Sequence, residues 1–191
     1  MLTQTPKSMS FSAAMGYVHK GAAFLDLRPV DDYLDVHIPE SLSLLYEFGP
    51  GMPSRARDCI PLEVPLVLLD LGTGDMGNAA ASLRGKGFDV VGKIDDGINE
   101  WSKWHGTPAS TEIHQGPAPA DGAILHVGDP GTGAIEGDVI PIPIERLWSR
   151  VGEISGRERV YVAAGYGPRA ALAVGILERA GIDDVVFWKT R

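Results

Sequence analysis

The sequence predicts an α/β fold, in which mainly parallel sheets are flanked by helices. Short apolar runs bounded by turn residues alternate with stretches that carry apolar residues at helical spacing, a pattern typical of such folds. The same order of elements occurs on both sides of a segment rich in Pro, Gly, Ala and Ser. We therefore expect two tandem units, at residues 8–108 and 121–191, joined by a linker at residues 109–120.

The first unit contains three apolar runs that we expect to form buried strands. They are Ala22–Leu27, Pro65–Leu71 and Phe88–Ile94. A glycine-rich turn, Gly72–Gly77, follows the second run and precedes an expected helix at Asn78–Lys86. The segment 97–104, GINEWSKW, is expected to close the unit as a helix. Trp101 and Trp104 would then share one face of this helix and pack the core.

The second unit repeats this order in a shorter span. Strands are expected at Ala123–Val127, Arg159–Ala164 and Asp184–Trp188, with a further apolar segment at Val139–Ile144. Helices are expected at Glu145–Ile154 and Arg169–Ala180. The repeat of strand, helix, strand and helix supports parallel sheets in both units.

Composition excludes several classes of function. Among the 191 residues, 44% are hydrophobic and 22% are charged, as in ordinary globular proteins. The net charge of −8 and the lack of a basic stripe argue against nucleic acid as a partner. No apolar run approaches the roughly 20 residues that cross a bilayer, and the first residues do not resemble a leader. We expect a cytoplasmic location and no membrane partner.

Cofactors and metals are not expected. Cys59 is the only cysteine, which excludes a disulfide within the chain, and the five histidines are scattered without ligand spacing. Gly72, Gly74 and Gly77 do fit G-x-G-x-x-G, the pattern of dinucleotide-binding turns. Because no acidic ribose partner follows convincingly at the next strand end, nucleotide binding is the least favoured interpretation.

A family resemblance enters at Leu25–Pro39, which reads LDLRPVDDYLDVHIP. A strand ending in L-D-x-R, an aromatic residue five positions after the Arg, and then H-I-P resemble the rhodanese family. Gly87–Phe88 and the closing segment Asp95–Trp101 also stand where that family has similar residues. The second unit is less similar: Val127–Pro130 replaces the D-x-R strand end, and Gly133–Pro143 only partly resembles G-H-I-P-G-A-I-N-I-P. The resemblance implies two tandem rhodanese-like domains.

The resemblance also implies a set of scaffold residues: Asp26, Arg28, His37, Gly97 and Trp101. A carboxylate and a guanidinium at a strand end can pair, and a histidine before Ile38–Pro39 can fix a turn by hydrogen bonding. We therefore expect structural roles for these side chains.

The family's active loop reads C-x-x-G-x-R and leads into a helix. Its thiolate takes up a sulfane sulfur as a persulfide, and backbone N–H groups at the helix N-terminus lower the thiol pKa. In the second unit Ala164 stands at the cysteine position. In the first unit this position falls on Leu71 when Gly74 is the anchor, or on Asp70 when Gly87 is. No cysteine occupies any of them.

The sequence therefore predicts a catalytically inactive rhodanese-like protein that acts as a binding or regulatory module in sulfane or persulfide metabolism, with another protein of that metabolism as its partner. Its loops are candidate sites for thiosulfate, sulfate or phosphate. The residues concerned are Gly165, Tyr166, Gly167, Arg169, Gly72, Thr73 and Gly74. Arg169 would equally suit a capping role on its own helix.

The alternative is a thiosulfate or persulfide sulfurtransferase that uses Cys59 or an unexpected nucleophile. Arg55 and Arg57 shortly precede this cysteine in the sequence and would lower the pKa of its thiol if they lay close to it. A cysteine that precedes the strand, however, is better explained as a loop residue without a function. The oligomeric state stays open.

Overall fold

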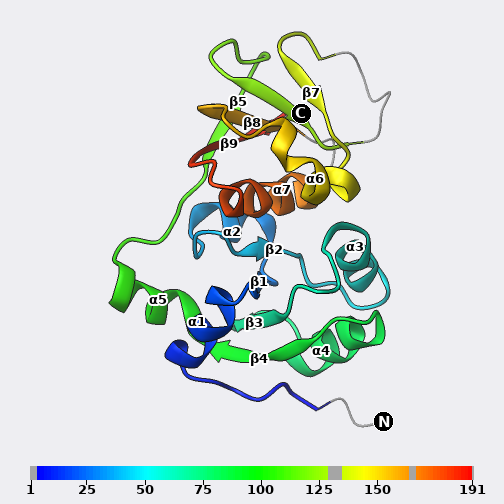
Figure 1. Cartoon of the computed structure of the whole chain (residues 1–191), viewed down its shortest axis with the longest axis vertical. Helices are drawn as coiled ribbons and strands as arrows, with labels where there is room; N and C mark the ends of the chain where they lie inside the picture. Colours follow the sequence, from blue (N-terminus) through cyan, green and yellow to red (C-terminus); the bar gives the residue numbers. More distant parts are fainter. Residues whose placement is uncertain (1–3, 129–134, 164–166, 191) are drawn as a thin grey trace.

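The computed structural model of the chain describes residues 4–128, 135–163 and 167–190. The described strands form two sheets, and every strand pair within them is parallel. Helices pack against both sheets (Figure 1). The predicted α/β fold is thus confirmed.

The first sheet has the strand order β2-β1-β3-β4. Its strands are β1 (Ala23–Asp26), β2 (Leu42–Ser43), β3 (Leu66–Asp70) and β4 (Val90–Asp95). The helices of this unit are α1 (Phe11–His19), α2 (Val30–Asp35), α3 (Gly51–Cys59), α4 (Met76–Gly85) and α5 (Gly97–His105). Helices α3 and α4 cover one face of the sheet, and α1 and α5 cover the other (Figure 1).

Strand β3 shows why the apolar runs of this unit are continuous. Leu66 and Leu68 pack into the cluster that contains α3 and α4, whereas Val67 and Leu69 pack into the cluster that contains α1 and α5. Because successive side chains of a strand point to opposite faces, a sheet covered on both faces needs apolar residues at every position.

The second sheet has the order β5-β9-β8-β6-β7. Its strands are β5 (Glu112–Gln115), β6 (Ala123–His126), β7 (Val139–Pro141), β8 (Arg159–Ala163) and β9 (Asp184–Lys189). Its helices are α6 (Ile144–Arg150), the short 3₁₀ helix η1 (Val151–Glu153) and α7 (Gly167–Arg179). Without β5, the order β7-β6-β8-β9 repeats the order β2-β1-β3-β4 of the first sheet. The two units therefore share one topology.

The second unit differs from the first in its helices. Both α6 and α7 lie on the side of the sheet that faces the first unit (Figure 1). The other face holds a small cluster centred on Ile124, Tyr161 and Val186, packed against Ala118 and other partly buried residues. Among the described residues, this unit has no counterpart of α1 and α5 on that face.

Two expectations need correction. Residues 112–115, within the segment predicted as a linker, form the edge strand β5, which pairs with β9. An edge strand is held by backbone hydrogen bonds and needs no apolar period, so the sequence pattern did not show it. Trp104 is 74% exposed and does not pack the core. Six residues after Ile98, which does pack, it is turned by about 120° around the helix.

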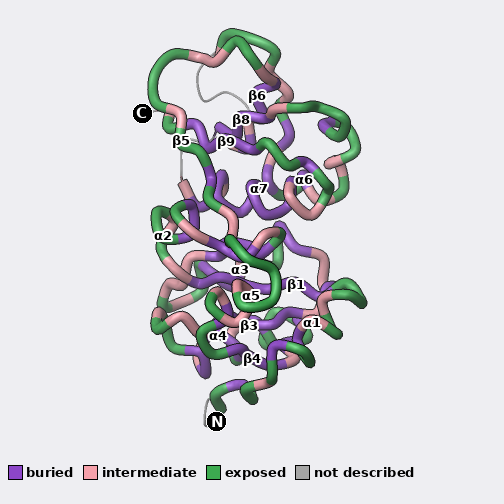
Figure 2. The backbone as a smooth tube through the Cα atoms, turned by 90° about the vertical axis from the view of Figure 1, so that its left-hand side faces the viewer, coloured by how far each residue is buried: buried purple, intermediate pink, exposed green. Residues whose placement is uncertain are grey.

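Helix α7 lies between the two sheets and joins them into one core. Figure 2 shows it as a buried segment between the two units, and every residue of Ala170–Leu177 is buried. The helix packs against β2 and α2 of the first unit and against β8, β9 and α6 of its own. Gly175 lies so close to β2 that an added Cβ would overlap the carbonyl oxygen of Ser41. Apolar residues of both units consequently belong to one continuous cluster.

The described part of the chain lacks two kinds of feature. None of its helices is both long and apolar enough to span a bilayer. Nor do its His, Cys, Asp and Glu side chains form a group of three or more that would hold a metal ion.

Candidate functional site

The carboxyl end of β3 is the place where the first unit would carry its nucleophile. Asp70 is the last residue of this strand, and its carboxylate accepts a hydrogen bond from Nζ of Lys93 on β4 at 2.6 Å. Lys93 also bridges to Asp95, and its pKa is raised chiefly by its hydrogen bond to Asp70. Asp70 therefore serves an ion pair between neighbouring strands.

Leu71, the other residue that fits the nucleophile position, is partly buried and packs against the cluster under α1 and α5. Neither residue offers a sulfur atom, a thiolate or a free carboxylate. Both alternatives for the first unit thus have structural explanations.

The glycine-rich turn after β3 has two residues at positive φ, Gly72 at 78° and Gly74 at 82°. A Cβ added at Gly74 would come within 2.8 Å of the Tyr46 ring, so the turn packs closely under this side chain. Asp75 is the N-cap of helix α4, and its carboxylate accepts a hydrogen bond from the Asn78 amide at 2.9 Å.

This geometry argues against an anion at Gly72, Thr73 and Gly74. The helix N-terminus, which would attract an anion, already holds the carboxylate of Asp75. The amide of Gly72 donates to the carboxylate of Asp70 at 3.4 Å. The carboxylates of Asp70 and Asp75 would therefore repel an incoming sulfate or thiosulfate.

The corresponding loop of the second unit lies only partly within the described residues. Ala164, Gly165 and Tyr166 fall outside them, so the predictions for these residues stay predictions. Gly167 is the first residue of α7. The guanidinium of Arg169 lies 3.4 Å from a carboxylate oxygen of Glu145 on α6, which ties the start of α7 to its neighbour.

Asp26 and Arg28 form the pair expected at the end of β1. The Arg28 guanidinium donates to both carboxylate oxygens of Asp26, from Nη2 at 2.7 Å and from Nε at 3.0 Å. It also donates to the carbonyl of Val36 at 2.6 Å, which fixes the chain after α2. Asp26 is fully buried, so this two-pronged contact is a structural one.

His37 does more than fix a turn. Its ring is fully buried, stacks on Tyr33, and places Nδ1 2.9 Å from the Tyr33 carbonyl oxygen. Its Nε2 lies 2.8 Å from Oε1 of Glu178 on α7, while the other carboxylate oxygen of Glu178 accepts from the amide of Glu40 at 2.8 Å. The H-I-P segment of the first unit is therefore bonded directly to the second.

Gly97 and Trp101 support the opposite side of the first sheet. A Cβ at Gly97 would approach Leu69 to 2.9 Å, so the small residue lets α5 lie close to β3. Trp101 stacks on His105 with ring centroids 4.7 Å apart and packs against the cluster under α1. Both residues make packing contacts, and the structural roles that the resemblance implies for them stay predictions.

Cys59 ends helix α3 rather than lying in a loop, and it is only 4% exposed. Burial is the main reason why the pKa of its thiol rises from an ordinary 9.0 to about 12, and Glu145 and Asp58 raise it further. Arg169 and Arg55 lower it, but they do not outweigh burial. These observations count against the hypothesis that Cys59 is a reactive thiol.

Sequence reasoning missed the residues that join the units. Glu178 is 141 positions from its partner His37, a separation that no local pattern reveals. Glu40 had a signal that was overlooked: it follows H-I-P, where the family motif has glycine, and its φ is +68°. Lys93 lies within an apolar strand, where a buried cation requires carboxylate partners.

Two parallel sheets that share the order of four strands, each packed against helices, define an α/β protein with two units of one topology. Comparison with known proteins gives the family of its first unit. Residues 12–103 match the family model described as "Rhodanese-like domain". This part of the chain is a rhodanese-like domain.

Solved structures that match include the crystal structure of thiosulfate sulfurtransferase from Pseudomonas aeruginosa. The sequences are 20% identical, and the TM-score is 0.41. The match covers 96% of this chain and 41% of that one, so the chain spans less than half the length of that protein. No curated protein matches the chain.

Proposed function

We propose that the chain is a non-catalytic rhodanese-like protein that acts as a binding or regulatory module in sulfane or persulfide metabolism. The observation that carries the proposal is the state of its only thiol. Cys59 is buried in α3, and its pKa is raised to about 12. Sulfur transfer needs a thiolate that a donor can reach. At the end of β3, Asp70 is paired with Lys93 and offers no nucleophile in place of a thiolate.

The binding activity that we propose is centred on the start of α7. Arg169 and the backbone of Gly167 stand at the N-terminus of a helix of 13 residues, where backbone N–H groups favour an anion. The ion pair with Glu145 would have to loosen for Arg169 to bind thiosulfate or sulfate. A partner from sulfur metabolism and a cytoplasmic location remain predictions from the sequence.

Intact-protein mass spectrometry tests the loss of sulfur transfer. The protein is incubated with thiosulfate, mercaptopyruvate or glutathione persulfide, and the mass gained by one sulfur atom is sought. We expect no such gain in the native protein, and gain only after Cys59 is exposed in urea. A native persulfide that is absent from Cys59→Ser would contradict the proposal.

Anion binding is tested separately by the shift of the melting temperature in sodium thiosulfate. We expect a shift in the parent that is lost in Arg169→Gln and kept in Arg146→Gln, a matched change on the exposed side of α6. Equal shifts in both variants would point to a general salt effect and remove the anion site.

A second candidate function keeps sulfur transfer and assigns it to Cys59. One observation favours it: Arg169 acts electrostatically on this thiol, so Cys59 lies near the start of α7 although it belongs to the first unit. Opening of the contact between α3 and α6 would expose the thiol near the start of α7. Turnover that disappears in Cys59→Ser would establish this function.

A further inference from the structure

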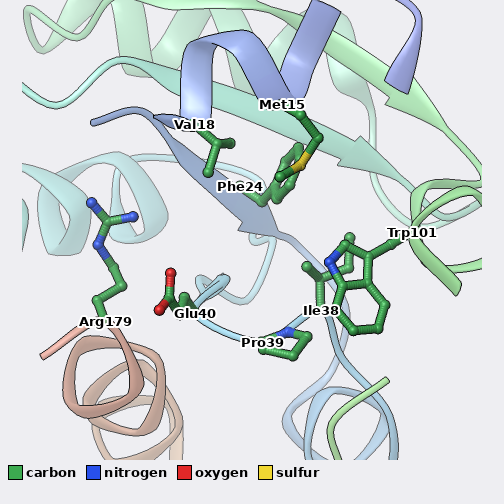
Figure 3. A pocket seen from close by; sticks show the side chains of 8 residues that line it. All are labelled: Met15, Val18, Phe24, Ile38, Pro39, Glu40, Trp101 and Arg179. Atoms are coloured by element: carbon green, nitrogen blue, oxygen red, sulfur yellow. The ribbon is translucent and has the colours of Figure 1, made fainter. Parts of the chain in front are cut away.

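A cavity of about 210 Å³ is lined by residues of both units (Figure 3). Its lining comes from α1, β1, the segment after α2, α5 and the end of α7. The lining residues are Met15, Val18, Phe24, Ile38, Pro39, Glu40, Trp101 and Arg179.

Most of the wall is apolar. Phe24 and Ile38 are buried, while Met15, Val18 and Trp101 are partly buried around them. An apolar cavity of about 150 Å³ already admits a benzene ring, so this one has room for a molecule with an apolar group of a few carbon atoms. The wall alone would accept any such group.

Glu40 supplies a carboxylate at this apolar wall. Its backbone lies in the left-handed region, at φ +68°, which is costly for a residue with a Cβ. The bond from its amide to Glu178 holds it there. Glu40 is exposed to solvent, and partial desolvation beside this wall is the main reason why the pKa of its carboxyl is raised. Its hydrogen bond within the described residues is made by the backbone amide, so the carboxylate itself accepts none from them. A cation at this place would stabilise it.

Arg179 supplies a guanidinium on the same side of the cavity (Figure 3). It stacks over Trp148 at 5.3 Å and donates two long hydrogen bonds, to the carbonyls of Ala22 at 3.3 Å and Gly21 at 3.4 Å. The guanidinium has five N–H groups, so donors remain for an anion. Within the described residues, Glu40 and Arg179 influence each other's charge but form no ion pair.

We propose that this cavity binds a small zwitterion with an apolar side chain, that is, an α-amino acid of the aliphatic class. The ammonium group would bind Glu40, the carboxylate would bind Arg179, and the side chain would lie against Phe24, Ile38 and Trp101. Glu40 and Arg179 carry opposite charges, line the same cavity without forming an ion pair, and adjoin an apolar wall. A zwitterion with an apolar side chain matches this arrangement in charge and in size. The proposal goes beyond the proposed function and holds whether or not the chain transfers sulfur.

Such a ligand would link the two units. Glu40 belongs to the first unit and Arg179 to the second, so the bound molecule would contact both. A ligand that binds only the assembled pair stabilises it by mass action.

Equilibrium dialysis with L-norleucine tests the site, together with two molecules that each lack one charged group. Hexanoate lacks the ammonium group, and pentylamine lacks the carboxylate. We expect norleucine to bind about tenfold or more tightly than either, because each charged hydrogen bond contributes at least that factor. Absence of norleucine binding, or equal binding of hexanoate or pentylamine, would overturn the proposal.

Glu40→Gly separates binding from folding. It removes the carboxylate and also relieves the positive φ, so we expect an unchanged or higher melting temperature with about a tenfold or greater loss of norleucine affinity. Glu63→Gln, at an exposed position of the same unit, is the matched control and should bind as the parent does. Parent-like affinity in Glu40→Gly would show that this carboxylate takes no part.

Discussion

At the scale of single residues, the burial of Cys59 has a consequence that can be measured through pH. The folded protein holds the thiol proton more tightly than the unfolded chain, because the pKa is raised from 9.0 to about 12. Between these values the unfolded state loses the proton first, so the contribution of this thiol to stability falls as the pH rises.

We predict that the free energy of unfolding of the parent falls relative to that of Cys59→Ala between pH 8 and pH 11. Urea denaturation of both proteins at each pH gives this difference, in which the other titrating groups cancel. A difference that stays constant over this range would mean that the thiol ionises as it does in the unfolded chain.

In the native protein at pH 8 we also expect iodoacetamide to modify Cys59 only slowly.

Residue-scale patterns predicted the scaffold better than the reactive groups. Asp26 and Arg28 are two positions apart and meet where the pattern placed them. Cys59 was expected in a loop beside arginines, yet the neighbours that set its pKa include Glu145 and Arg169 from the other unit. The reactivity of a thiol depends on burial and on neighbours that are distant in the sequence, and the residues that flank a cysteine in the sequence predict neither.

At the scale of elements, α7 is a described helix that packs against elements of both units. It is buried on the side of its own sheet and on the side of β2, which explains why its residues from Ala170 to Leu177 are small or apolar. Gly175 permits the closest approach, with the Tyr33 hydroxyl 3.1 Å and the Ser41 carbonyl oxygen still nearer to the position of an added Cβ. Because the two Ser41 atoms near this position belong to the backbone, they leave little room for adjustment.

Gly175→Ala should therefore destabilise the protein by about 3 kcal/mol or more, since α7 would have to move away from β2. Gly16→Ala in α1 is the matched control, because nothing lies within 4 Å of its added Cβ. The control should stabilise the protein by up to about 1 kcal/mol through a better helix propensity. Urea denaturation compares them; a Gly175→Ala protein as stable as the parent would show that the close contact does not exist.

Elements were predicted from the sequence wherever packing imposed a period. Strand β3 and helix α4 lie within one or two residues of their expected bounds, because burial on both faces of the sheet and the glycine-rich turn between them leave clear signals. Strand β5 was missed because it is exposed along most of its length and pairs with β9 without an apolar period in its sequence. The packing of α7 against the first unit was not predictable, because an apolar helix has the same sequence pattern whichever sheet covers it.

At the scale of the whole molecule, the two sheets share one apolar core and a buried polar contact. His37 of the first unit contacts Glu178 of α7, and Arg179 donates to the two carbonyl groups just before β1. Tandem domains on a flexible linker would unfold separately. Here the continuous cluster predicts a single cooperative transition.

Calorimetry should therefore record one transition whose calorimetric and van't Hoff enthalpies agree. Glu178→Ala should lower the stability of the entire protein by about 2 kcal/mol or more, because it leaves the buried His37 ring without its partner. The exposed change Glu63→Ala should stay within about 0.5 kcal/mol of the parent. Two resolved transitions, with only one shifted by Glu178→Ala, would contradict a shared core.

We propose above that this chain, whose residues 12–103 match a rhodanese-like domain, does not transfer sulfur, and thiocyanate formation from cyanide tests that proposal most directly. Thiosulfate, mercaptopyruvate and glutathione persulfide serve in turn as donors for the parent and for Cys59→Ser. We predict no turnover above the uncatalysed rate in either protein, because the thiol is buried and protonated and the strand ends carry no other sulfur. Turnover by the parent that vanishes in Cys59→Ser would contradict the account and make Cys59 the nucleophile.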